Sequence, residues 1–243
     1  MEPLALCGPA GHVAGVDARL RSLRRRSETT GALEDEAALL RERSRAGDLD
    51  RERLELAAWL GHPAAVSVVG RQAPDDLELL LCSFEHLLQH GPGLGRWGKE
   101  ACVRAALATG RLALGRWRAL VGNDESVVQA IRYSEEWLSA DSHSGPQAEA
   151  RRVAREVDER GLELYSLFSA ERPGQRREHE LAFSALRAIA HAALTVGGPA
   201  PEAELVAAEG AGYAAWHGHA DAVGAICEEL IPWALSSAPE STT

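Results

Sequence analysis

Cysteine and histidine recur along residues 82–90 with the spacing of a metal site. Cys82, His86 and His90 are four residues apart, so on a helix they project along one side and could supply three ligands to a zinc-type ion. Apolar residues crowd the same segment, and no fourth ligand is tied to it. We therefore expect Cys82 in the core with the histidines along a polar edge. A small helical metal-binding protein or metalloenzyme is the alternative.

His217 and His219 form a second candidate, with Asp221 two residues further on. His-x-His pairs occur in metal centres, and a carboxylate could complete the ligand shell. The competing interpretation is structural, because His62 occupies the place of His219 in an internal repeat and no second histidine precedes the glycine there. We favour the structural role, and we expect no metal and no cofactor.

Signatures of covalent or phosphate chemistry are missing. The sequence contains no G-x-S-x-G, and the glycine-rich residues 91–95 lack the Lys-Ser/Thr of a phosphate loop. Adjacent carboxylates, as at Glu135 and Glu136, point about 100° apart on a helix and do not converge on one substrate. We therefore expect a protein that is not an enzyme.

The strongest internal signal is a repeat. Residues 57–66 read AAWLGHPAAV and residues 214–223 read AAWHGHADAV, so seven of ten positions agree. Small alanines allow helices to approach closely, glycine ends a helix in the left-handed conformation, histidine can cap a turn, and tryptophan covers the hairpin with an apolar face. We expect two similar helical hairpins with both tryptophans largely buried. The candidate structural residues are Trp59, Gly61, His62, Trp216, Gly218 and His219.

Two resemblances accompany these motifs. The pattern L-A-A-x-x-G-H-x-x-x-V over residues 56–66 resembles the helix-turn-helix of an ankyrin repeat, and residues 213–223 are similar. The ankyrin opening Thr-Pro-Leu-His and a tandem repeat of 33 residues are absent, so only the hairpin geometry is implied.

Residues 101–235 resemble the all-helical immunity proteins of bacterial toxin systems. The shared features are an Ala-rich helix ending in tryptophan at residues 105–117, the segment at 128–138 with Trp137, and His-Gly-His-Ala at 217–220. The resemblance implies an all-helical, cytoplasmic bacterial protein that binds and inhibits a protein partner.

Composition and stop signals predict an all-α fold, either a multi-helix bundle or an irregular α-solenoid of about ten to twelve helices. Ala, Leu, Glu and Arg dominate, whereas strand-forming residues are scarce. The expected helices end at glycines and begin at Asp50, Pro63 and Asp75, which can cap a helix or occupy its first turn. They cover residues 13–27, 32–46, 51–60, 63–70, 77–88, 97–109, 111–120, 124–139, 146–169, 176–196, 202–216 and 219–235.

Domain organisation is expected to be simple. We predict a partly ordered segment over residues 1–30, one helical domain over 31–235 with a subdivision near 141–146, and a disordered tail over 236–243. Four cysteines without regular spacing and the lack of an 18-residue apolar run predict a reduced, cytoplasmic protein that does not enter a membrane.

Net charge bears on the partner. The formal charge of -10 argues against nucleic acid, and no Lys or Arg follows Arg187. We expect the carboxylates beyond that point to lack local basic partners and to form an electronegative face for a basic protein. An ordinary solubilising surface is the alternative, and an exposed tryptophan would mark a contact surface. The candidate face consists of Glu202, Glu209, Asp221 and Glu228.

Overall fold

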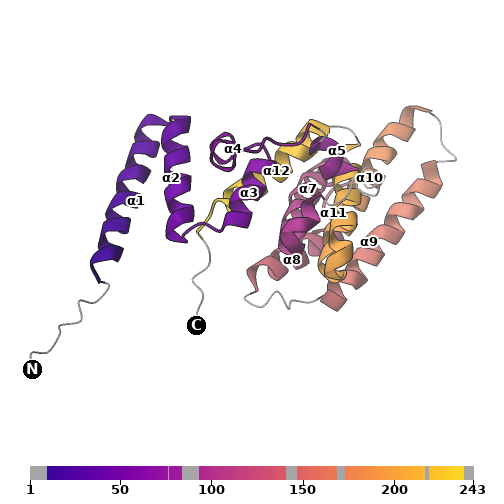
Figure 1. Ribbon diagram of the computed structural model, residues 1–243. Helices are drawn as coiled ribbons and strands as arrows, with labels where there is room; N and C mark the ends of the chain where they lie inside the picture. Colours follow the sequence, from indigo (N-terminus) through magenta and orange to yellow (C-terminus); the bar gives the residue numbers. More distant parts are fainter. Residues whose placement is uncertain are drawn as a thin grey trace, which may run out of the picture. The chain divides into compact units, whose positions relative to one another are not determined.

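The computed structural model describes residues 10–75, 77–83, 93–140, 147–168, 173–216 and 219–237. The described residues form eleven α-helices and one 3-10 helix with no strand (Figure 1). The all-α prediction, with ten to twelve helices, is confirmed. The chain divides into two compact units: residues 1–74 with 231–243 form unit 1, and residues 75–230 form unit 2. The expected subdivision near 141–146 lies outside the described residues.

Unit 1 is built from four helices and the last residues of α12. α1 packs against α2, and α4 packs against both α2 and α3. Asp50 begins α3 by accepting a hydrogen bond from the Glu52 amide, and Pro63 occupies the first position of α4, as predicted. The helices are α1 (Ala10–Thr30), α2 (Leu33–Ala46), α3 (Arg51–Trp59) and α4 (Pro63–Val69).

Unit 2 is organised around α10, which packs against α7, α8, α9 and α11. Alanine fills much of the α10 surface, and Ala188, Ala190 and Ala193 are fully buried. Small side chains let the neighbouring helices approach closely, so the unit needs few large core residues. The elements are α5 (Leu77–Cys82), η1 (Leu94–Trp97), α7 (Gly98–Leu120), α8 (Glu125–Ser139), α9 (Gln147–Phe168), α10 (Pro173–Gly197), α11 (Ala200–Ala215) and α12 (His219–Ala234), which passes into unit 1 after Leu230.

Two expected helix boundaries are wrong. A break at Gly110 was expected, but α7 continues through it because α8 and α10 pack on this position; an added Cβ would lie 2.8 Å from Cδ1 of Ile131. The helix expected over 77–88 ends at Cys82, and Ser83 is not helical. The Cys82 carbonyl points at Gly212 of α11, where an added Cβ would lie 2.7 Å from the oxygen. Residues 84–92 lie outside the described residues.

Two cations hold the end of α10. Lys99 donates hydrogen bonds from Nζ to the carbonyls of Val196 and Gly198 at 2.7 and 2.8 Å, and Arg151 donates to the carbonyl of Gly197. Helix C-termini leave carbonyls without intrahelical partners, and cations are favourable there. Desolvation lowers the pKa of Lys99, and the nearby charge of Arg151 acts in the same direction.

Close helix packing in unit 2 leads to a pair of opposite predictions for glycine-to-alanine changes. At Gly210 of α11 the new methyl group would lie 2.7 Å from Cβ of His191, an atom that moves only with the α10 backbone. Overpacking costs about 1–3 kcal/mol, against a helix-propensity gain of about 1 kcal/mol. We expect Gly210→Ala to lower the free energy of unfolding by about 1 kcal/mol in urea titrations.

Gly115 of α7 is the matched control, because nothing lies within 4 Å of an added Cβ there. The propensity gain then acts alone, and Gly115→Ala should stabilise the chain by about 0.5–1 kcal/mol. Stabilisation by both changes would contradict the close contact between α10 and α11.

Candidate functional site

Glu209, one of the four candidate acidic residues, points from α11 toward α10. Its Oε2 lies 3.3 Å from Nε2 of His191, and its Oε1 lies 3.6 Å from Nη2 of Arg187. The hydrogen bond with His191 holds the pKa of Glu209 below its usual value, although partial burial opposes this effect. Glu209 is therefore ionised and neutralised from within the chain.

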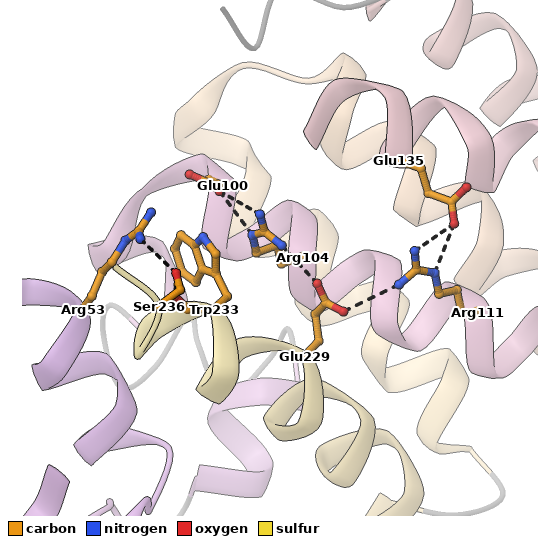
Figure 2. A network of polar contacts seen from close by, with 8 residues as sticks. All are labelled: Arg53, Glu100, Arg104, Arg111, Glu135, Glu229, Trp233 and Ser236. Atoms are coloured by element: carbon orange, nitrogen blue, oxygen red, sulfur yellow. Dashed lines mark hydrogen bonds and ion pairs between the residues drawn. The ribbon is translucent and has the colours of Figure 1, made fainter. Parts of the chain in front are cut away.

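The arginines of α7 neutralise further carboxylates of the C-terminal region. Asp221 lies 3.2 Å from Nη2 of Arg116. Figure 2 shows Glu229 of α12 between Arg104 and Arg111, at 3.1 and 3.5 Å. The same arginines also contact Glu100 at 3.1 Å and Glu135 at 2.8 Å, so the network joins α7, α8 and α12.

The expectation that these carboxylates lack basic partners is therefore wrong for Glu209, Asp221 and Glu229. Their partners lie on α7 and α10, and no inspection of the C-terminal sequence alone could supply them. Glu202 and Glu228 are exposed and have no ion-pair partner among the described residues. The electronegative contact face stays a prediction. Glu202 and Glu228 are the two of its four residues that no cation of the described residues neutralises.

Unit 1 contains a separate contact between α3 and the end of α12. The guanidinium of Arg53 lies 4.6 Å from the centre of a Trp233 ring, and Nη1 donates to Ser236 at 3.5 Å (Figure 2). A cation over an aromatic face is attractive, so this contact attaches the C-terminal residues to unit 1.

Each copy of the repeat covers the end of one helix and the start of the next. The first joins α3 to α4, with Gly61 in the left-handed conformation at φ 86° and His62 accepting a hydrogen bond on Nδ1 from the Ala65 amide at 3.3 Å. His62 thus caps α4. The second copy joins α11 to α12, but His217 and Gly218 lie outside the described residues, as does the side chain of His219.

The expectation that both tryptophans are largely buried is wrong for Trp216. Trp59 is partly buried, whereas Trp216 is 60% exposed. Trp59 is the last residue of α3, and Trp216 follows the last residue of α11 but keeps helical backbone angles (φ -46°, ψ -29°), so the helix ends alone do not explain the difference in exposure. An exposed tryptophan of this kind indicates a contact surface.

Neither metal candidate lies wholly within the described residues. Within the described part of the chain, no group of three His, Cys, Asp or Glu side chains could hold an ion. Cys82 is buried, and His86 and His90 fall in the segment that is not described. Burial raises the pKa of Cys102 to about 12, so this thiol is protonated and a poor ligand or nucleophile.

Exposed apolar side chains gather at one end of unit 2, where α7, α9 and α11 each contribute. Trp216 and Tyr165 are the aromatic members, and Tyr165 is 58% exposed. One other large apolar residue is exposed in the described part of the chain, namely Leu33 in unit 1. We call this region the apolar end; it consists of Leu120, Val121, Leu162, Tyr165 and Trp216.

Direct contacts bring these helices together. Arg116, one turn before Leu120 in α7, donates a hydrogen bond to the Ala214 carbonyl at 2.6 Å, which places the ends of α7 and α11 side by side. Arg160 of α9 contacts Asp124, between α7 and α8. The apolar end is therefore one region with several contributing helices.

Contacts between aromatic rings also join α9, α10 and α11. The Tyr165 and Phe183 ring centres lie 5.2 Å apart, and those of Phe183 and Tyr213 lie 6.0 Å apart. Arg187 lies over Tyr213 at 5.0 Å and contacts Asp158, so a row of packed side chains joins α9, α10 and α11. Tyr165, an exposed member of the apolar end, is thereby packed against α10.

Comparisons with protein-family models, curated proteins and solved structures find no match. None of the helices in the described part of the chain combines the length and apolar character that crossing a bilayer requires.

Sequence reasoning missed four of the five residues of the apolar end. Helix periodicity assigns apolar residues to the core, and exposure at the end of a helix depends on where its neighbours stop. One signal was available at Leu162, which lies beside the stripe of buried small residues at Ala150, Ala154, Val157 and Gly161.

Proposed function

We propose that this chain is a non-catalytic protein-binding module and that the apolar end of unit 2 is its contact surface. The observation that carries the proposal is the exposure of Trp216, Tyr165 and three aliphatic side chains on α7, α9 and α11. The ends of these helices are joined by contacts such as the hydrogen bond from Arg116 to the Ala214 carbonyl. Tryptophan and tyrosine contribute most to binding energy in protein interfaces, and clustered exposed apolar residues mark contact surfaces.

Charge supports a basic partner. Unit 1 holds 11 arginines and 12 carboxylates, a net charge of -1, so -9 of the total charge of -10 belongs to unit 2. A surface of this sign accelerates encounter with a basic protein through long-range attraction. With the resemblance to helical immunity proteins, this favours an inhibitor that binds and covers a basic partner.

The test is quantitative affinity capture with the tagged full chain, followed by binding measurements with the recovered protein. We expect Trp216→Ala to lower affinity for a basic partner about thirtyfold or more, since truncating an interface hot spot costs about 2 kcal/mol or more. Leu33→Ala is the matched control, because it removes an exposed apolar side chain from unit 1. Equal affinity of the wild type and the Trp216→Ala variant for the partner would exclude the apolar end as the contact surface.

The steering role of charge is tested separately with Glu202→Gln and Glu228→Gln, which disturb no ion pair within the described residues. Together they should slow association at low salt and leave the Tm unchanged. An association rate insensitive to both salt and these changes would remove the electronegative face from the proposal.

A further inference from the structure

A basic pocket lies within unit 1, among α2, α3 and α4. Its volume is about 230 Å³, several times the roughly 30 Å³ that one water occupies in the liquid. Three arginines line it, together with one carboxylate, one hydroxyl and an apolar wall. The lining residues are Arg41, Ser44, Arg45, Arg51, Leu54, Glu55, Val68 and Val69.

The positive charge of this pocket is only partly neutralised. Arg41 has no ion-pair partner among the described residues, and Arg45 is 3.9 Å from Glu42, beyond hydrogen-bond distance. Arg51 contacts Glu55 at 3.3 Å, but through Nε alone. Three guanidinium groups therefore face one lining carboxylate, in a chain whose net charge is -10.

Helix dipoles do not account for this arrangement. Arg45 lies in the last turn of α2, where a cation is favourable, but Arg51 is the first residue of α3, where it is unfavourable. An anion bound beside Arg51 would offset that cost, although the Asp50 carboxylate already caps the amides at this end of α3. The pocket thus has electrostatic reasons to hold an anion.

The hydrogen-bond donors and the apolar wall of the pocket indicate which class of anion fits it. Guanidinium groups form paired hydrogen bonds with phosphate oxygens, and the Ser44 hydroxyl has no hydrogen-bond partner among the described residues. A phosphomonoester carries nearly two negative charges at pH 7 and three acceptor oxygens, which matches the excess of two positive charges. Leu54, Val68 and Val69 form the apolar wall, which suits an organic substituent.

We propose that this pocket binds a small phosphomonoester, with Arg41, Arg45 and Arg51 around the phosphate and the apolar wall against its substituent. The site is separate from the protein-binding surface of unit 2, so it would add a small-molecule ligand to a protein-binding module.

Isothermal titration calorimetry of the full chain tests this proposal with phenyl phosphate, inorganic phosphate and benzoate. Phenyl phosphate should bind at one site, more tightly than inorganic phosphate because of the apolar wall and more tightly than benzoate because of its second charge. No saturable binding of either phosphate would overturn the proposal. Benzoate binding as tight as phenyl phosphate would overturn the phosphate assignment, and equal binding of the two phosphates would overturn the role of the wall.

Variants identify the site. Arg41→Gln should weaken phenyl phosphate binding about tenfold, as expected for the loss of one charged hydrogen-bonding group. Arg25→Gln is the matched control, because it removes the same charge from an exposed position of α1 outside the pocket lining. Circular dichroism checks that each variant is folded. An equal loss of phenyl phosphate affinity in both variants would show that binding reflects general charge attraction and would exclude the pocket as the binding site.

Discussion

Replacing Trp137 with alanine is expected to lower the free energy of unfolding by about 3–5 kcal/mol, as for other buried tryptophans. Trp137 is 3% exposed and projects from α8 into a cluster formed by Val103, Ala150 and Val196, on three other helices. Alanine would leave a cavity, because the surrounding side chains of Val103, Ala150 and Val196 are too small to fill the space of the indole. The Tm should fall by roughly 10 °C.

Trp216→Ala is the matched control for this experiment. The same atoms are removed from a side chain that is 60% exposed, so we expect a change in unfolding free energy within about 0.5 kcal/mol. Urea denaturation of both variants measures the difference. Similar losses at the two positions would contradict the exposure of Trp216 and the apolar end with it.

The second large effect is expected at Arg187 of α10. Its guanidinium contacts Asp158, lies 3.6 Å from Glu209 and covers the Tyr213 ring, with only 16% of the side chain exposed. Arg187→Met keeps much of the apolar stem but leaves two carboxylates without this counter-charge. Breaking a buried pair costs about 3–5 kcal/mol, and partial exposure of both carboxylates reduces this to about 2–3 kcal/mol.

Thermal unfolding measures this effect, as a fall in Tm of roughly 5–10 °C. Arg152→Met is the control, because Arg152 pairs with Glu149 and Glu156 on the solvent-exposed surface of α9. Exposed pairs add little stability, so its Tm should match the wild type. Equal Tm values for the Arg187 and Arg152 variants would show that the Arg187 cluster adds nothing to the packing of α9, α10 and α11.

Local signals predicted the helices well because caps and breaks act over a few residues. Asp50, Pro63 and Asp124 begin helices where the sequence placed them. Gly110 misled the prediction because its helical conformation is imposed by α8 and α10, which no local window contains. Tertiary packing therefore overrode the intrinsic preference of glycine.

The candidate site was less predictable than the fold. Partners for Glu229 lie more than 100 residues earlier in the chain, at Arg104 and Arg111, so ion pairing depends on how the helices pack. Trp216 is 60% exposed although it matches the partly buried Trp59 in the repeat, so its exposure depends on what packs around it and not on the local sequence. Seven matching positions in the repeat predicted the turns but not the direction of this side chain.

The contact that ends α10 gives the chain a chemical reporter. Lys99 is the sole lysine, and its amine is engaged with the carbonyls of Val196 and Gly198. An acylating reagent attacks only the deprotonated amine, and the engaged ammonium is not reactive, so the rate of Lys99 labelling at fixed pH reports how readily this side chain leaves the end of α10, against a background without competing side-chain amines.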